Sequence, residues 1–117
     1  ARQIQLLGAV DRSRIPSILS ACDVFLFPTL RIEGLPINVL EALASGLPVI
    51  TSNHMSPILG RALPAIYVDP HSPSDIAGAI TQAVAIDISI RTCLLPEQFW
   101  LSHCAAEYCR LRLTQAS

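Results

Sequence analysis

Lysine is absent from this chain of 117 residues, so all eight of its basic residues are arginines. Charged residues of both signs make up only 15%, and the formal net charge is −1. Non-specific binding to a nucleic acid needs a basic stripe that meets the phosphate backbone. We therefore expect no nucleic-acid partner, and any bound anion must be met by arginine or by backbone N–H groups.

Long apolar runs are also missing, and none reaches the roughly 20 residues of a membrane-spanning helix. The first ten residues, ARQIQLLGAV, lack an initiating Met and the pattern of a signal or transit peptide. We expect them to follow a cut inside a longer polypeptide.

A metal-binding pattern is absent as well. The cysteines form no CxxC pair, and the histidines lie outside the spacing of zinc ligands. The residues concerned are Cys22, Cys93, Cys104, Cys109, His54, His71 and His103. We expect no metal site, and a reducing, cytosolic environment.

Hydrophobic residues make up 51% of the chain, and they fall into strand-like and helix-like segments in turn. Strands are predicted over 4–10 (IQLLGAV), 23–29 (DVFLFPT), 47–53 (LPVITSN) and 65–70 (AIYVDP). Helices are predicted over 12–22, 35–46 and 72–87, with Gly46 as a left-handed cap and Ser72, Pro73 and Asp75 opening the third, and one or two further helices are predicted over 96–113. This alternation predicts βαβ units, and hence an α/β fold with a Rossmann-like parallel sheet flanked by helices.

The helix predicted to begin near Pro36 follows the strand over 23–29, so the loop before it lies at the carboxyl end of that strand. Doubly wound α/β folds bind their ligands outside those ends. No Ser, Thr, Asp or Asn stands just before Pro36 to cap the helix. The N–H groups of residues such as Ile37 and Asn38 are therefore open to an anion.

Two glutamates, Glu33 and Glu41, flank this helix start. Glu33 is predicted to project from the loop, and Glu41 lies roughly 7–8 Å along the helix axis from Pro36. That separation suits two contacts on one extended ligand, such as a nucleoside diphosphate sugar. A second interpretation makes Asn38, Glu41 and Ser45 a solvated helix stripe, with Glu33 a loop charge that can pair with Arg31. The residues alone leave both interpretations open.

The wider segment EGLPINVLEALASGLPVITSN resembles the signature of retaining glycosyltransferases of the GT-B fold, family 4, which carry an E-x7-E motif. Glu33 and Glu41 match that spacing, and the flanking strand–helix–strand segments are similar to the family in the same order. The likeness weakens after about Ile86. It implies that residues 1–117 are part of the C-terminal, donor-binding domain, without its first βα units and without the N-terminal acceptor domain.

The resemblance also implies roles for individual residues. Glu33 would be the catalytic residue, contacting the donor sugar and stabilising charge at the reacting centre. Glu41 would hydrogen-bond the ribose of the nucleotide, and the backbone of Gly34, Leu35 and Ile37 would face the diphosphate. From their positions at strand ends, Thr29 and His54 are candidates for the wall of the site.

The function implied is transfer of a hexose-type sugar, with retention, from a nucleoside diphosphate sugar to a glycan, lipid or other acceptor in polysaccharide biosynthesis. We expect no cofactor beyond that donor and no activity from the chain alone. The parent would act in the cytoplasm, either free or peripherally at the inner face of the membrane. The alternative is a non-catalytic module on the same fold, which binds a nucleotide sugar or serves in assembly.

Overall fold

A computed structural model describes residues 4–32, 34, 36–59, 64–86, 92–100 and 109, and of Ile58, Leu59 and Gln98 only the backbone. Its elements, in chain order, are η1 (Arg12–Arg14), α1 (Ile15–Ser20), β1 (Phe25–Phe27), α2 (Ile37–Ala44), β2 (Val49–Ser52), η2 (Asn53–Met55), α3 (Ser56–Leu59), β3 (Ile66–Val68), α4 (Pro73–Val84) and η3 (Glu97–Phe99). Helices and strands alternate through the sheet, as the sequence predicts.

The three strands form one parallel sheet in the order β1–β2–β3. Phe25 lies opposite Val49, and Ile50 opposite Ile66. All four residues of the central strand β2 are buried, which is typical of a parallel strand covered on both faces. The predicted α/β class with a parallel sheet flanked by helices is therefore confirmed.

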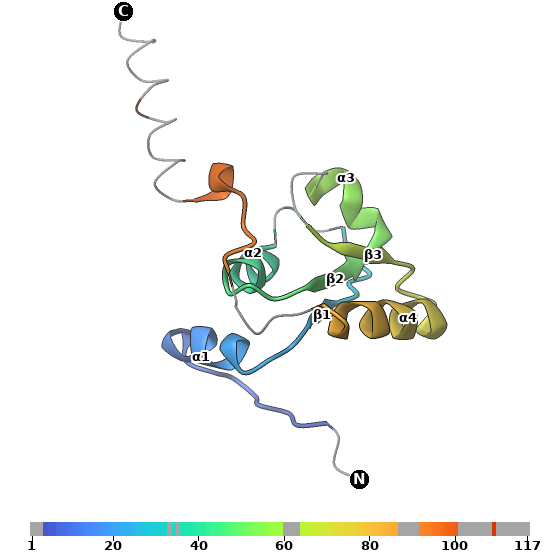
Figure 1. The fold of residues 1–117 in the computed structure, drawn as a ribbon, viewed down its shortest axis with the longest axis horizontal. Coiled ribbons are helices and arrows are strands. Elements are labelled where there is room, and N and C mark those ends of the chain that lie inside the picture. The colour runs from blue at the N-terminus through green and yellow to red at the C-terminus, as the bar shows by residue number, and fades with distance from the viewer. Residues whose placement is uncertain are drawn as a thin grey trace, which may run out of the picture.

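Successive residues of β2 point to opposite faces of the sheet and so belong to two separate cores. Val49 packs with Val39 and Leu43 of α2 and with Leu19 of α1, which we call the α2-face core. Ile50 packs instead with residues of α4, which we call the α4-face core. Helices α1 and α2 thus cover one face and α4 the other (Figure 1).

The turn from α2 into β2 is built as the sequence predicts. Gly46 has a φ of 78°, a left-handed conformation that glycine adopts without steric cost. Its N–H donates to the carbonyl of Leu43, and the N–H of Leu47 donates to that of Ala42. These two bonds form a Schellman motif, which ends the helix and directs the chain into the central strand.

The strand predicted over residues 4–10 is wrong. These residues have no strand conformation, and Ile4 and Leu6 are 86% and 91% exposed. Gly8, with a φ of 67°, interrupts any extended run. In the part of the chain that the structure describes, no strand lies beside them to pair with their backbone groups, so strand propensity alone is not enough.

Residues 92–100 cross back over α2. The N–H of Leu94 donates to the carbonyl of Leu43 at 2.8 Å, and Leu95 and Phe99 pack against the α2-face core. Of the one or two helices predicted over 96–113, the described residues hold η3, a 3-10 turn that ends at Phe99 because Trp100 is extended, and most of the remainder lies outside the described residues. No helix within the described ranges is both long enough and apolar enough to cross a membrane.

Candidate functional site

The carboxyl ends of β1 and β2 lie side by side, because the two strands are parallel and paired as far as Phe27 and Thr51. Residues 28–32, which we call the β1–α2 loop, continue from β1. His54, in η2, places Nε2 at 2.7 Å from the carbonyl oxygen of Arg31 in this loop. Since a carbonyl only accepts, Nε2 is assigned as the donor.

Thr29 lies in the same loop, and both of its oxygens are used within the protein. Its hydroxyl accepts from the N–H of Arg31 at 3.1 Å, and its carbonyl accepts from the hydroxyl of Ser52. Thr29 and His54 are therefore both at the predicted rim, where their polar atoms hold the loop. A direct contact of either residue with a ligand stays a prediction.

Helix α2 begins without a side-chain cap. Pro36 occupies the N-cap position with an extended backbone, and the first turn holds no acidic residue. The side-chain oxygen of Asn38 accepts from the N–H of Val39 at 2.9 Å. Among the described residues, nothing accepts from the N–H groups of Ile37 and Asn38, which lie at the positive end of the helix dipole.

Gly34 precedes this helix and is exposed. Its φ lies outside the left-handed range, and a Cβ built there meets no atom within 4 Å. Neither the backbone conformation nor the packing thus requires glycine at this position. A remaining physical reason for glycine is the close approach of a ligand to the backbone.

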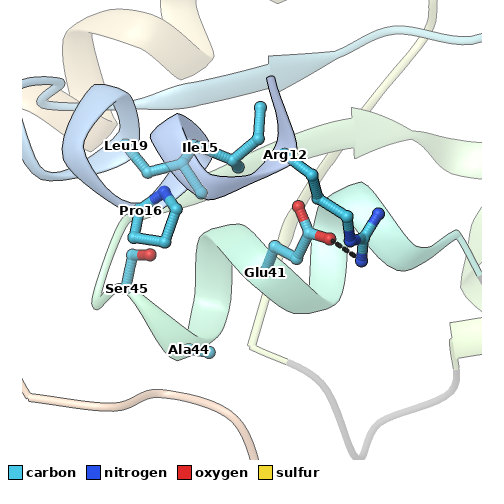
Figure 2. A pocket seen from close by; sticks show the side chains of 7 residues that line it. All are labelled: Arg12, Ile15, Pro16, Leu19, Glu41, Ala44 and Ser45. Carbon is cyan, nitrogen blue, oxygen red and sulfur yellow. Dashed lines mark hydrogen bonds and ion pairs between the residues drawn. The ribbon is translucent and has the colours of Figure 1, made fainter. Parts of the chain in front are cut away.

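Glu41 lies on the side of α2 that faces η1 and α1. Its carboxylate forms an ion pair with the guanidinium of Arg12 at 3.0 Å, 29 positions away in the sequence (Figure 2). The pair borders a hollow of about 260 Å³, lined by Arg12, Ile15, Pro16, Leu19, Glu41, Ala44 and Ser45. Glu41 is therefore not part of a fully solvated stripe, because its side chain is only 31% exposed.

The ion pair itself is weak. The Arg12 side chain is 82% exposed, and pairs of this kind contribute about 0–1 kcal/mol to stability. A ligand that donates hydroxyl groups to Glu41 can therefore displace the guanidinium at little cost.

The start of η1, from which Arg12 extends, is closed by Asp11. Its carboxylate accepts from the hydroxyl of Ser13 at 2.7 Å and from the N–H of Ser13 at 2.9 Å. These hydrogen bonds, that from the hydroxyl above all, lower the pKa of Asp11 below its ordinary value of 3.8. Asp11 thus fixes the turn on which Arg12 stands.

The structure brings together part of the predicted set. Gly34 and Ile37 adjoin the open start of α2, and Glu41 follows one turn later on the same helix. Glu33 and Leu35 lie outside the described residues, so their predicted roles are untested. Arg12 was not predicted as a site residue, because no local pattern relates it to Glu41. Among the described residues, no group of three or more His, Cys, Asp or Glu side chains has an arrangement that could hold a metal ion.

The family model of "Glycosyl transferases group 1" matches residues 1–92, which include every described residue of this site. The chain belongs to the group 1 glycosyltransferases. Residues Glu33 to Asn53 and the strand–helix–strand units around them thus lie inside the matched part of a group 1 glycosyltransferase.

Several curated glycosyltransferases are similar to the chain. A UDP-Gal:α-D-GlcNAc-diphosphoundecaprenol α-1,3-galactosyltransferase of Escherichia coli is 50% identical over 52 residues, 44% of this chain and 13% of that protein. The O-antigen chain mannosyltransferase B of Escherichia coli is 31% identical over 86 residues, 72% of this chain and 22% of that protein.

A third relative is the N,N'-diacetylbacillosaminyl-diphospho-undecaprenol α-1,3-N-acetylgalactosaminyltransferase of Campylobacter jejuni. It is 42% identical over 50 residues, 43% of this chain and 12% of that protein. The chain thus spans between 12% and 22% of the length of these three relatives. No solved structure matches the chain at a significant level.

Proposed function

We propose that this chain is the donor-binding part of a retaining glycosyltransferase with the GT-B fold, within its C-terminal domain. The donor is a nucleoside diphosphate sugar, and the acceptor is a glycan or a lipid-linked sugar. The observation that carries the proposal is the pairing of an uncapped start of α2 with a half-buried carboxylate on the same helix. Four residues, about 6 Å of helix axis, separate Ile37 from Glu41.

The open start of α2 suits the diphosphate. The N–H groups of Ile37 and Asn38 point out of the first turn with the positive end of the dipole behind them. Gly34 presents backbone without a side chain just before this turn. With no lysine in the chain, a bound anion is met by arginine or by backbone N–H groups such as these.

Glu41 suits the ribose. An ionised carboxylate has two acceptor oxygens, enough for the two adjacent hydroxyls of a ribose. When a nucleotide enters, those hydroxyls replace Arg12, whose exposed ion pair is easily broken. Arg12 is then free to meet a negative group of the ligand.

Glu33 is the proposed catalytic residue at the sugar end. Positive charge develops on the anomeric carbon as its bond to the diphosphate oxygen breaks, and a nearby carboxylate stabilises that charge. The negative charge that appears on the leaving diphosphate meets the start of α2. On this proposal, the two glutamates contact the sugar and the ribose, and the helix start between them faces the diphosphate.

The acceptor side is proposed from the relatives. The names of two of them describe transfer to sugars linked to diphosphoundecaprenol. We place the corresponding acceptor site in an N-terminal domain of the parent, acting at the inner face of the cytoplasmic membrane in polysaccharide assembly.

The test is a transfer assay on the full-length gene product. UDP- and GDP-sugars are supplied with lipid-linked acceptors, and NMR reads the anomeric configuration of the product. Retention is expected, and Glu33→Gln should lower kcat by at least about a hundredfold. Binding of a nucleotide sugar without any transfer would contradict the proposed transferase activity and support a non-catalytic module. A product of inverted anomeric configuration would contradict retention.

Gly34→Ala, with Gly78→Ala in the exposed part of α4 as the matched control, tests the contact with the diphosphate. Neither added methyl group meets a neighbouring atom within 4 Å, so both variants should fold normally. Only Gly34→Ala is expected to weaken donor binding, by about tenfold. Equal affinity in the two variants would contradict a close approach of the diphosphate at Gly34.

A further inference from the structure

Three side chains at the end of β2 donate hydrogen bonds to carbonyls of β1 and of the β1–α2 loop. The hydroxyl of Thr51 donates to Phe27 at 3.0 Å, the hydroxyl of Ser52 donates to Thr29, and Nε2 of His54 lies 2.7 Å from the carbonyl of Arg31. The accepting residues are 27, 29 and 31, every second position of the chain. We call this set the side-chain ladder.

The side-chain ladder continues the sheet where backbone pairing stops. The backbone register of β1 and β2 ends at Phe27 and Thr51. In extended chain, alternate carbonyls point to the same side, so those of Phe27, Thr29 and Arg31 can face β2 together. Beyond the paired register, the side chains of Ser52 and His54 thus take the place of a strand's N–H groups, and that of Thr51 adds a bond at the last backbone pair.

The donors of the ladder are unusually well fixed. Thr51 and Ser52 are fully buried, and in the described residues no buried side-chain N or O atom lacks a partner. Leaving a buried hydroxyl without its acceptor is costly, so the loop and the strand end are coupled. The side chain of His54 is half-buried beside them.

The β1–α2 loop has few means of holding itself in place. Pro28 has no N–H to donate, and the N–H of Arg31 is used inside the loop on the hydroxyl of Thr29. Leu30 and Ile32 are 65% and 89% exposed and so add little packing. The conformation of the loop therefore depends on the two donors that reach it, the hydroxyl of Ser52 and Nε2 of His54, while the hydroxyl of Thr51 bonds the end of β1 from which the loop begins.

We propose that Thr51, Ser52 and His54 are positioning residues, which act by fixing the loop from which Glu33 and Gly34 follow. Glu33 stands two residues after Arg31, and consecutive Cα atoms are about 3.8 Å apart, so the place of Arg31 limits the reach of Glu33. The assignment of a catalytic purpose to this loop rests on the proposed function. The ladder itself is a property of the fold and is tested separately.

The first test is hydrogen–deuterium exchange of the full-length gene product, which needs no ligand. In Ser52→Ala and His54→Leu, exchange of a peptide covering 29–34 should rise by about fivefold, while a peptide covering α4 stays unchanged. His54→Gln keeps an N–H donor and should restore much of the protection. Unchanged exchange in the loop overturns the proposal, as does an equal rise in α4, because that would be general loosening.

The second test separates the ladder from the proposed function. UDP-galactose and GDP-mannose are titrated beside UMP and GMP, against wild type, Thr51→Val and Thr51→Ser. Thr51→Val keeps the shape but loses the donor, and Thr51→Ser keeps the donor. Only Thr51→Val should weaken binding of the nucleotide sugar, by about fivefold. Binding of the monophosphate should not change, because neither substitution alters Glu41. If wild type binds none of these probes, the proposed function fails while the exchange result still decides the ladder. If the sugar nucleotide binds all three proteins equally, the positioning role is overturned.

Discussion

Helices α2 and α4 flank the same sheet from opposite faces, yet their first turns are built in opposite ways. At α4, the hydroxyl of Ser72 accepts from the N–H of Asp75 at 3.2 Å, and Pro73 follows at the first helical position. At α2, no side chain of the described residues caps the helix, and no acid stands in its first turn. A missing cap costs about 1 kcal/mol of helix stability. Because α2 follows β1 and α4 follows β3 in one parallel sheet, both starts lie at its carboxyl edge, where ligands bind in such folds. They differ in that a side chain closes the start of α4, whereas the N-cap residue of α2 gives none.

The largest expected effect is a loss of stability when the buried face of α2 is truncated, because no described side chain caps the start of this helix. Leu43 is fully buried in the α2-face core, so Leu43→Ala should lower the free energy of unfolding by about 2–5 kcal/mol. Ile80→Ala on α4 is the control, because Ile80 is 36% exposed and should cost less than about 1 kcal/mol. Urea unfolding measures both. Similar losses would mean that the buried face of α2 does not anchor it.

An acidic residue placed at the second helical position of each helix tests whether the two starts differ in binding an anion. Asn38→Asp and Ser74→Asp should each leave stability unchanged or raise it by about 0.3–1 kcal/mol, since both favour the helix dipole. Only Asn38→Asp should repel a nucleoside diphosphate, by about tenfold in affinity. Calorimetric titration of both variants with UDP and GDP measures this. A loss of similar size in Ser74→Asp would remove the distinction between the two starts.

A smaller effect is expected from opening α4. Ser72→Ala removes the cap and should cost about 0.5–2 kcal/mol in thermal or urea unfolding, without changing nucleotide affinity. Gln82→Ala, at an exposed position of the same helix away from its start, is the control. If Ser72→Ala and Gln82→Ala were equally stable, the cap of Ser72 would not contribute to the stability of α4.

The smallest effect is expected at η1, whose start is capped by the side chain of Asp11. The pKa of Asp11 is lowered in the folded state, so the ionised carboxylate stabilises the fold. This stabilisation is fully present above the ordinary pKa of 3.8 and is lost as the pH falls through the lowered value. Asp11→Asn should therefore lose less stability than wild type between about pH 6 and about pH 3. Unfolding curves at the two pH values measure this loss of stability. An identical loss in wild type and Asp11→Asn would mean that the bonds from Ser13 to Asp11 do not stabilise the fold.

The sequence predicts these helix ends well because the signals are local. Ser72, Pro73 and Asp75 stand within four positions, and Gly46 directly follows the helix that it ends. The central strand is predicted for a similar reason, since its apolar run lies between two turn signals. Such features need no knowledge of distant contacts.

Two other features depend on partners that no local pattern reveals. Residues 4–10 are predicted as a strand from their apolar character, but burial requires a neighbouring strand, and residues 4–9 are exposed. Arg12 meets Glu41 across 29 positions, through the packing of α1 on α2. The sequence supplied the glutamate and its spacing from the helix start, and the structure supplied its charge partner and the hollow beside it.

The most direct test of the central claim is a titration of the full-length gene product with UDP, GDP and ADP, for wild type and Glu41→Ala. Wild type is expected to bind one of these nucleotides selectively, and Glu41→Ala is expected to weaken that binding by at least about tenfold. Glu97→Ala, which removes an exposed carboxylate in η3, should leave the affinity unchanged. Equal affinity in wild type and Glu41→Ala, or no binding by the folded wild type, would contradict the assignment of Glu41 and of the open start of α2 to a nucleotide.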